Sequence, residues 1–221
     1  MASKSSKSSP RPKTRDRILQ TALALFNEEG EAEVSTVEIA AVLDISPGNL
    51  YYHFKGKDAI IEGLFDDFEE EIRQVLTAPI AKPLAVEDNW IYLYIIFEEI
   101  HDFRFFYNAL PTLLDRCPSL QPRFRRLMAL KQDVAKAILI SLQKAGVLAI
   151  SQTGVDLLAE RIALQITYWI QYCSLKDPNR KEAALIHEGV FSILSQLTPW
   201  LGEDGIAYAT LLEEFYESRN A

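Results

Sequence analysis

The chain has 221 residues, of which 48% are hydrophobic, and a formal net charge of -8 at pH 7. This length is enough for one large domain or for a small domain joined to a larger one. No apolar run reaches the roughly 18–20 residues of a membrane span, and no apolar stretch follows the charged start, so we expect neither a membrane protein nor a secretory signal peptide. The two cysteines, Cys117 and Cys173, lie far apart. They argue against a disulfide framework and favour a cytoplasmic protein.

Positive charge is concentrated at the N-terminal end. Residues 1–27 hold six Lys or Arg residues and a single acidic residue, Asp16, whereas acidic residues dominate the rest. The stretch 1–13 is rich in Ser, Lys and Pro, which predicts a disordered tail. A basic end on an acidic body indicates a surface for an anionic partner, although a solubilising tail would have the same charge pattern.

Two helices are predicted next. Apolar residues recur at three- and four-residue steps from Thr14 until Gly30, where the first helix should end. Ser35 or Thr36 can cap the second helix. The following stretch LDIS predicts a tight turn, with Asp44 at the position where a left-handed residue is expected. Asp tolerates that conformation better than most residues do.

A third, short helix is predicted to begin at Pro47 after a Ser46 cap and to end before Gly56. Two helices joined by a tight turn are typical of a helix-turn-helix. Leu50 and Phe54 are four residues apart and therefore share the face that packs inward. The other residues of this helix should point outward, as a polar and aromatic surface suited to a DNA major groove; they are Pro47, Gly48, Asn49, Tyr51, Tyr52 and His53.

The remaining pattern is helical throughout. A fourth helix is predicted from Lys57 to about Thr77, followed by the proline-containing break APIAKPLA. Further helices are predicted at about 87–101, 104–115, 119–145, 153–174, 181–198 and 205–218. We therefore predict an all-α fold with a three-helix DNA-binding domain at 14–62, a connecting helix that continues to about 78, and a larger helical bundle at 79–221, to which the resemblance described next assigns a regulatory role.

The segments RILQTALALFNEEG and STVEIAAVLDISPGNLYYHFKGKDAII resemble the DNA-binding domain of the TetR family of transcriptional regulators. The resemblance implies a homodimer in which the N-terminal helices bind double-stranded operator DNA and the C-terminal bundle binds a small-molecule effector. By position, it also implies DNA contacts from Thr36, Asn49, Tyr51, Tyr52, His53 and Lys57. The chain departs from the family pattern in lacking an aromatic residue just after Gly30 and in having Asp44 in place of the turn glycine.

Aromatic residues are dense between Trp90 and Tyr107 and again between Tyr168 and Tyr172. Most such residues form core, but Tyr and Trp have polar groups that need partners when they are buried, and a cluster of them around a cavity is typical of a ligand pocket. With the resemblance, this pattern predicts a ligand-binding set of Trp90, Tyr94, Phe97, Tyr107, Met128, Gln165 and Trp169.

The resemblance also implies a dimer interface formed by the helices near 153–174 and 181–198. The second of these has an apolar stripe that is too wide to leave in water, with a glycine that allows close approach. The predicted interface residues are Ile186, Gly189, Val190, Ile193, Leu194 and Leu197. Part of this stripe must also serve the core of the single chain.

Three classes of function fit this sequence. The leading prediction is a ligand-responsive repressor without catalysis, in which the fourth helix acts as a lever that pivots at APIAKP. The second is a helical-bundle enzyme, for which EEIHDF offers only one Glu98–His101 pair at the spacing of di-iron bundles. The third is a protein-interaction adaptor without specific DNA binding. We predict no catalytic residue, metal or cofactor.

Overall fold

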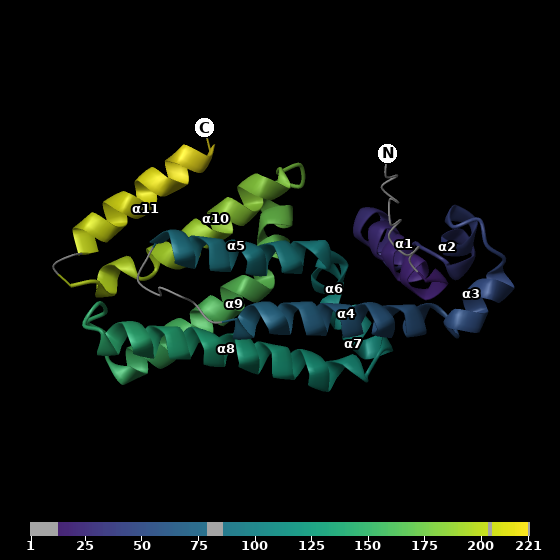
Figure 1. The fold of residues 1–221 in the computed structure, drawn as a ribbon, viewed down its shortest axis with the longest axis horizontal. Coiled ribbons are helices and arrows are strands. Elements are labelled where there is room, and N and C mark those ends of the chain that lie inside the picture. The colour runs from purple at the N-terminus through teal and green to yellow at the C-terminus, as the bar shows by residue number, and fades with distance from the viewer. Residues whose placement is uncertain (1–12, 79–85, 203–204, 221) are drawn as a thin grey trace, which may run out of the picture. The chain divides into compact units, whose positions relative to one another are not determined.

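The computed structural model describes residues 13–78, 86–202 and 205–220 (Figure 1). In these ranges the regular structure is helical, apart from one isolated bridge between Leu148 and Leu201. The predicted all-α class is therefore confirmed. The chain divides into two compact units, one that ends at Leu64 and one that begins at Phe65. The basic tail predicted at 1–13 and most of the APIAKP break lie outside the described residues.

The first unit contains α1 (Thr14–Glu29), α2 (Thr36–Val42) and α3 (Pro47–His53). Local capping explains where the last two helices begin. The Ser35 hydroxyl accepts a hydrogen bond from the backbone N–H of Glu38 at 3.2 Å, and the Glu38 carboxylate accepts one in return from the Ser35 N–H at 3.4 Å. The Ser46 hydroxyl accepts a hydrogen bond from the Asn49 N–H at 3.1 Å. These caps match the predicted helix starts.

The turns of this unit also match the prediction. Gly30 ends α1 with a φ of 90°, and Asp44 adopts a φ of 54° between α2 and α3. Leu50 and Phe54 are buried, as their spacing predicts. Gly63, on the first part of the next helix, packs closely against this core, because an added Cβ would stand 3.1 Å from carbons of both Leu19 and Phe54. The unit is thus a tightly packed base beneath α3.

Helix α4 (Lys57–Thr77) runs without a break across the division between the units. Its second half belongs to the second unit, where four of its apolar side chains are buried: Phe65, Phe68, Ile72 and Leu76. The other elements of this unit are α5 (Val86–Asp102), α6 (Arg104–Asn108), α7 (Leu110–Arg116), α8 (Leu120–Lys144), α9 (Gln152–Lys176), α10 (Glu182–Ser195), the short 3-10 helix η1 (Thr198–Trp200) and α11 (Gly205–Asn220).

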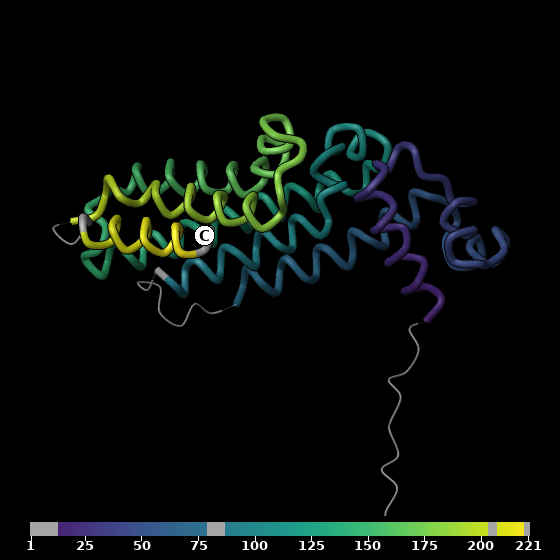
Figure 2. Tube along the Cα trace, turned by 90° about the horizontal axis from the view of Figure 1, so that it is seen from above, coloured from purple at the N-terminus to yellow at the C-terminus, as the bar shows by residue number. Residues whose placement is uncertain are grey.

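The second unit is a bundle of long helices. α8 packs along α9, while α10 contacts α5, α9 and α11 (Figure 2). Its interior contains a cluster of mutually contacting rings: Phe65, Phe68, Phe103, Phe106, Tyr107 and Phe124. Cys117 and Cys173 are buried and unbridged. Among the described helices, none is both long and apolar enough to cross a membrane.

Two predicted helix boundaries in this unit are wrong. The helix expected at 104–115 is broken at Ala109, whose φ of -123° and ψ of 24° are not helical. Pro111 explains the break because it has no N–H to donate to the carbonyl of Tyr107. The Gln171 side-chain amide donates to that carbonyl instead, at 2.6 Å. The helix expected at 181–198 already ends at Ser195.

Candidate DNA-reading face and ligand cavity

The outer face of α3 is polar and aromatic. Tyr51 is 57% exposed and Tyr52 is 77% exposed, and Pro47, Gly48 and Asn49 are exposed as well. His53 is half-buried, with its ring against the edge of Tyr52 at 5.3 Å between centroids. The Lys55 ammonium lies 4.7 Å from the centre of the Tyr51 ring, a cation–π contact that holds a positive charge beside this face. We call this surface, with Thr36 at the start of α2, the reading face.

The residue types of the reading face suit contacts with DNA. An Asn side chain can form two hydrogen bonds to adenine, and Tyr hydroxyls can reach phosphates or base edges. Because Leu50 and Phe54 anchor the opposite side of α3 in the core, the exposed residues have few packing duties. That these particular side chains contact DNA remains a prediction.

Lys57 differs from the other predicted DNA contacts because its ammonium is already engaged. It lies 3.1 Å from the carboxylate of Glu31, whose side chain is 3% exposed. It also donates to the backbone carbonyls of Glu31 at 2.8 Å and Val34 at 3.0 Å. The structure therefore gives Lys57 a role within the unit, where it fixes the loop between α1 and α2. Its predicted contact with a phosphate is not shown.

The second unit encloses an apolar cavity between α4, α5, α8, α9 and α10. Its internal volume is about 60 Å³, and thirteen of its sixteen lining residues are aliphatic. The other three are Asn89, Tyr92 and Lys131. The Tyr92 hydroxyl donates to the carbonyl of Leu76 at 3.0 Å, which ties α5 to the last turn of α4 beside the cavity.

None of the seven residues predicted to bind a ligand lines this cavity. Trp90 instead packs against His187 and Phe215, with ring centroids 5.8 and 5.1 Å away. The Trp169 indole N–H donates to the Leu185 carbonyl at 2.8 Å. The positions of the others are as follows: Tyr94 contacts His187, Phe97 and Tyr107 are buried, Gln165 pairs with Gln196, and Met128 lines a separate, open hollow. The predicted aromatic residues are thus packed outside the cavity wall, and the cavity itself is lined mainly by aliphatic side chains.

Lys131 is the charged residue that sequence reasoning missed. Its side chain is in the cavity wall and is 2% exposed. The ammonium donates to the hydroxyls of Tyr107 at 3.1 Å and Thr167 at 3.2 Å. Burial lowers the pKa of Lys131 to about 7. The sequence does contain a signal for this burial, because Lys131 falls four residues after Leu127 and four before Ala135 and therefore lies on the buried apolar stripe of α8.

The predicted dimer stripe on α10 must be corrected. All six residues are buried within the chain itself, and three of them, Ile193, Leu194 and Leu197, line the cavity. The close approach at Gly189 is also internal, since an added Cβ would stand 2.7 Å from the Trp169 indole nitrogen. These side chains are thus unavailable to a second copy. The other helix of the predicted interface, α9, does present an exposed apolar stripe, formed by Leu157, Leu164, Tyr168, Tyr172 and Leu175.

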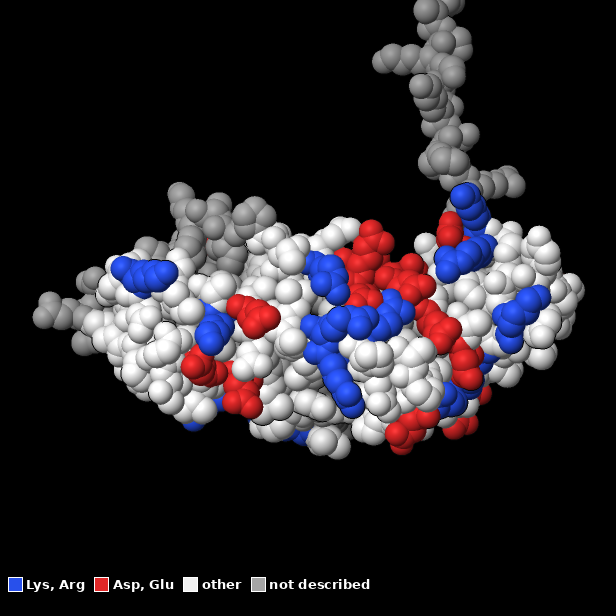
Figure 3. All heavy atoms as spheres, turned by 90° about the horizontal axis from the view of Figure 1, so that it is seen from below, with Lys and Arg blue, Asp and Glu red and all other residues white. Residues whose placement is uncertain are grey.

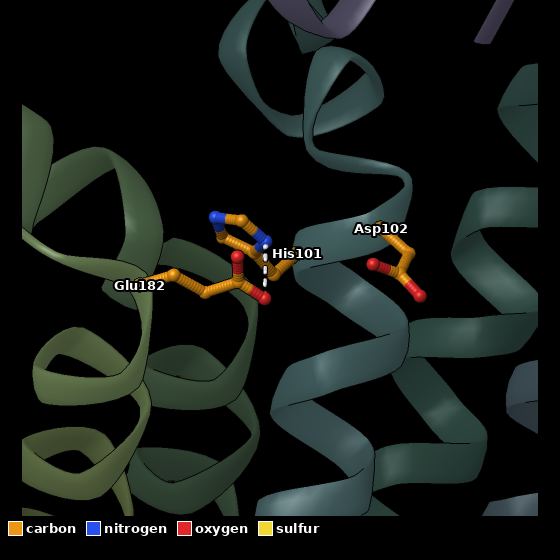
Figure 4. A group of neighbouring side chains, drawn as sticks. All are labelled: His101, Asp102 and Glu182. Atoms are coloured by element: carbon orange, nitrogen blue, oxygen red, sulfur yellow. Dashed lines mark ion pairs between the residues drawn. The ribbon is translucent and has the colours of Figure 1, made fainter. Parts of the chain in front are cut away.

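The EEIHDF segment brings His101 next to acidic groups. The His101 ring on α5 faces Glu182 on α10, with 3.2 Å between Nδ1 and the carboxylate (Figure 4). Asp102 completes a group of potential metal ligands, but it and Glu182 are exposed. Burial lowers the pKa of His101 despite these neighbours. The geometry is that of a half-buried histidine beside an exposed carboxylate, and Glu98 is not part of the group.

Charged side chains also connect α4 to α8. The Arg123 guanidinium contacts the carboxylates of Asp66 at 2.8 Å and Glu69 at 2.5 Å and lies 4.6 Å from the centre of the Phe65 ring. On the face drawn in Figure 3, Lys and Arg side chains neighbour Asp and Glu side chains. Between α4 and α5, burial and the Glu71 carboxylate raise the pKa of Glu99 to about 7.

Comparison with known proteins gives matches over most of the chain. Residues 18–64 match the family described as bacterial regulatory proteins, tetR family, and residues 67–208 match the family described as bacterial transcriptional repressor. The chain is similar to the crystal structure of a TetR-family transcriptional regulator from Marinobacter aquaeolei VT8. The two share 31% identity with a TM-score of 0.83, over 94% of this chain and 99% of that one.

Other similarities are partial or more distant. The probable HTH-type transcriptional regulator YttP of Bacillus subtilis is 36% identical over 63 residues, which are 28% of this chain and 30% of that protein. The chain therefore spans about a third of the length of the curated relatives it matches. The SmeT–triclosan complex has 18% identity and a TM-score of 0.58, over 87% of this chain and 93% of that one. That likeness shows the fold alone.

Proposed function

The chain belongs to the TetR family of bacterial regulatory proteins, and we propose that it is a ligand-responsive repressor that a small molecule releases from a palindromic operator. The observation that carries the proposal is the reading face, where Tyr51 and Tyr52 are displayed while Leu50 and Phe54 are held in the core. This is the arrangement of a recognition helix that enters a major groove. We propose that the protein acts in the cytoplasm and has no catalytic role.

Recognition of a palindrome requires two reading faces about 34–36 Å apart, and therefore a dimer. We propose that the exposed stripe of α9 supplies the interface. Leu164 is 55% exposed and Leu175 is 88% exposed in the single chain. Apolar side chains repeated at helical spacing on an exposed helix gain stability when a second copy covers them. Sedimentation of a Leu164→Arg variant tests this, because it should be monomeric where the parent chain is dimeric.

Helix α4 is the proposed link between ligand and DNA. Its first residue, Lys57, holds the loop between α1 and α2 in the first unit. Its last turn lines the cavity of the second unit through Leu76. A ligand that prefers a cavity with Leu76 displaced would shift α4 and with it the spacing of two reading faces. By linkage, operator DNA must then weaken ligand binding by the same factor by which ligand weakens DNA binding. SmeT, which shares this fold, is described in complex with the small molecule triclosan.

The reading face is tested by operator binding. Genomic fragments that the purified protein captures would supply the operator for gel-shift titrations. Asn49→Ala and Tyr51→Ala should each lose roughly 1–3 kcal/mol of discrimination between operator and unrelated DNA. Their melting temperatures should remain those of the parent because both side chains are exposed. Gln132→Ala, an exposed change on α8, is the matched control. Parental discrimination in both α3 variants would show that the reading face is wrongly assigned.

A further inference from the structure

The apolar cavity of the second unit has a single charged group in its wall. Among the described residues that line it, Lys131 alone carries a formal charge. The Lys131 ammonium has three N–H donors, but the structure provides two acceptors, the hydroxyls of Tyr107 and Thr167. Neither acceptor is an anion. A buried ammonium is costly unless a negative charge compensates it, and in the described chain no carboxylate pairs with this one.

The remainder of the cavity defines a complementary apolar body. Its lining follows α8 from Lys131 to Leu142, a span of roughly 16 Å at 1.5 Å per residue. Along that span α8 presents Val134, Ala135 and Ile138, and α9 faces the cavity with Ile162 and Ile166 among others. Such walls favour an extended hydrocarbon over a polar or highly charged molecule. A molecule that matched both features would have one anionic end and an aliphatic chain.

We propose that this cavity binds an aliphatic carboxylic acid whose carboxylate pairs with the Lys131 ammonium. The carboxylate supplies the missing acceptor and the missing counter-charge. The hydrocarbon chain enters the cavity along α8, and a chain longer than the cavity of about 60 Å³ can hold displaces wall residues such as Leu76, as the proposed function requires. Charge-assisted hydrogen bonds in a water-poor site are among the stronger polar contacts in proteins. The inference rests on the proposed function only in that it names the chemical class of the effector.

The test compares two probes that differ at one end. The full-length protein is titrated calorimetrically with decanoate and with decanol, both at concentrations below the onset of micelles. Decanoate should bind roughly 10- to 100-fold more tightly than decanol. Equal affinities for the two probes would overturn the proposal, and so would an absence of decanoate binding.

Variants locate the binding site. Lys131→Met should bind both probes equally, whereas Lys131→Arg should keep the preference for decanoate. Lys144→Met, which removes an exposed lysine from the end of the same helix, is the matched control and should behave as the parent. A preference that survives Lys131→Met would refute the role of the ammonium. Ala135→Leu fills the cavity and should weaken binding of both probes. Unchanged decanoate binding in Ala135→Leu would place the ligand elsewhere. If Lys131→Met does not fold, the Ala135→Leu titration is the test of the site.

The two proposals fail separately. If the protein binds operator but does not prefer decanoate, only the inference about the ligand is lost. If it prefers decanoate through Lys131 but binds no specific DNA, the proposed function is lost and the cavity retains its assigned chemistry. Operator binding is therefore measured first without any probe, and then with decanoate at saturation.

Discussion

The buried ammonium of Lys131 predicts an unusual dependence of stability on pH. Its pKa is lowered from 10.5 to about 7 by burial. Between these two values the unfolded chain binds a proton at this lysine that the folded chain does not bind, so the free energy of unfolding should rise with pH over that window. Below about pH 7 the folded chain must bury the charge, and this cost is then fully present. Tyr107 does not interfere because burial raises the pKa of its phenol and keeps it neutral.

The size of the effect follows from the pKa shift. Each pKa unit is equivalent to about 1.36 kcal/mol of difference between the two protonation states. With values of 10.5 unfolded and about 7 folded, a change from about pH 6 to about pH 9 should add roughly 2–3 kcal/mol to the free energy of unfolding at this site. Lys131→Met removes the titrating group and with it this contribution.

The assay is urea unfolding at several pH values for the parent, Lys131→Met and Lys144→Met. Subtracting the Lys131→Met profile from the parent profile cancels the groups that both share, including Glu99 and His101. The difference should slope upward by roughly 2–3 kcal/mol over that interval, and Lys144→Met should follow the parent because Lys144 is exposed. Parallel profiles for the parent and Lys131→Met would show that Lys131 has an ordinary pKa and that its charge costs nothing in the fold.

Three further predictions concern packing and backbone geometry. Lys57→Ala should lower the free energy of unfolding by about 2–3 kcal/mol, because buried Glu31 loses its cationic partner; urea unfolding with parental stability would contradict this. Asp44→Gly should raise the free energy of unfolding by about 0.5–1 kcal/mol, since a φ of 54° suits glycine; an unchanged melting temperature would refute this. Gly189→Ala should lower it by about 1–3 kcal/mol, because the new Cβ would stand 2.7 Å from Trp169, and unchanged tryptophan fluorescence would argue against that clash.

The parts of the fold that the sequence predicts well are those set by neighbouring residues. Ser35 and Ser46 accept hydrogen bonds from backbone groups three residues ahead, so the starts of α2 and α3 do not depend on the rest of the chain. The inward side of α3 follows from the spacing of Leu50 and Phe54. The break at Pro111 follows from its missing N–H, but only the tertiary contact from Gln171 shows how the freed carbonyl is satisfied.

The proposed ligand site depends on how distant helices meet, and the residues predicted from the sequence do not line the cavity. The predicted aromatic residues are large enough to fill the interior, as Trp90 does against Phe215 of α11. Which gap remains unfilled is decided by side chains from five helices together. Lys131 was passed over because a lysine on a helix usually extends its charge into water. The apolar stripe of α10 was assigned to the dimer interface because a sequence pattern does not show whether a second copy or the chain's own core covers an apolar face.

The two-sided construction of α3 has a consequence for how the proposed DNA specificity can diverge. Folding depends on Leu50 and Phe54 beneath the helix, whereas Asn49, Tyr51 and Tyr52 are exposed and have few packing duties above it. Duplicated copies of the gene can therefore exchange the upper residues and acquire new DNA targets without first gaining spare stability. Lys57 is not open to such exchange because the loop beneath it depends on its charge. Selection for new specificity should accordingly change the upper surface of α3 quickly and leave Lys57 in place.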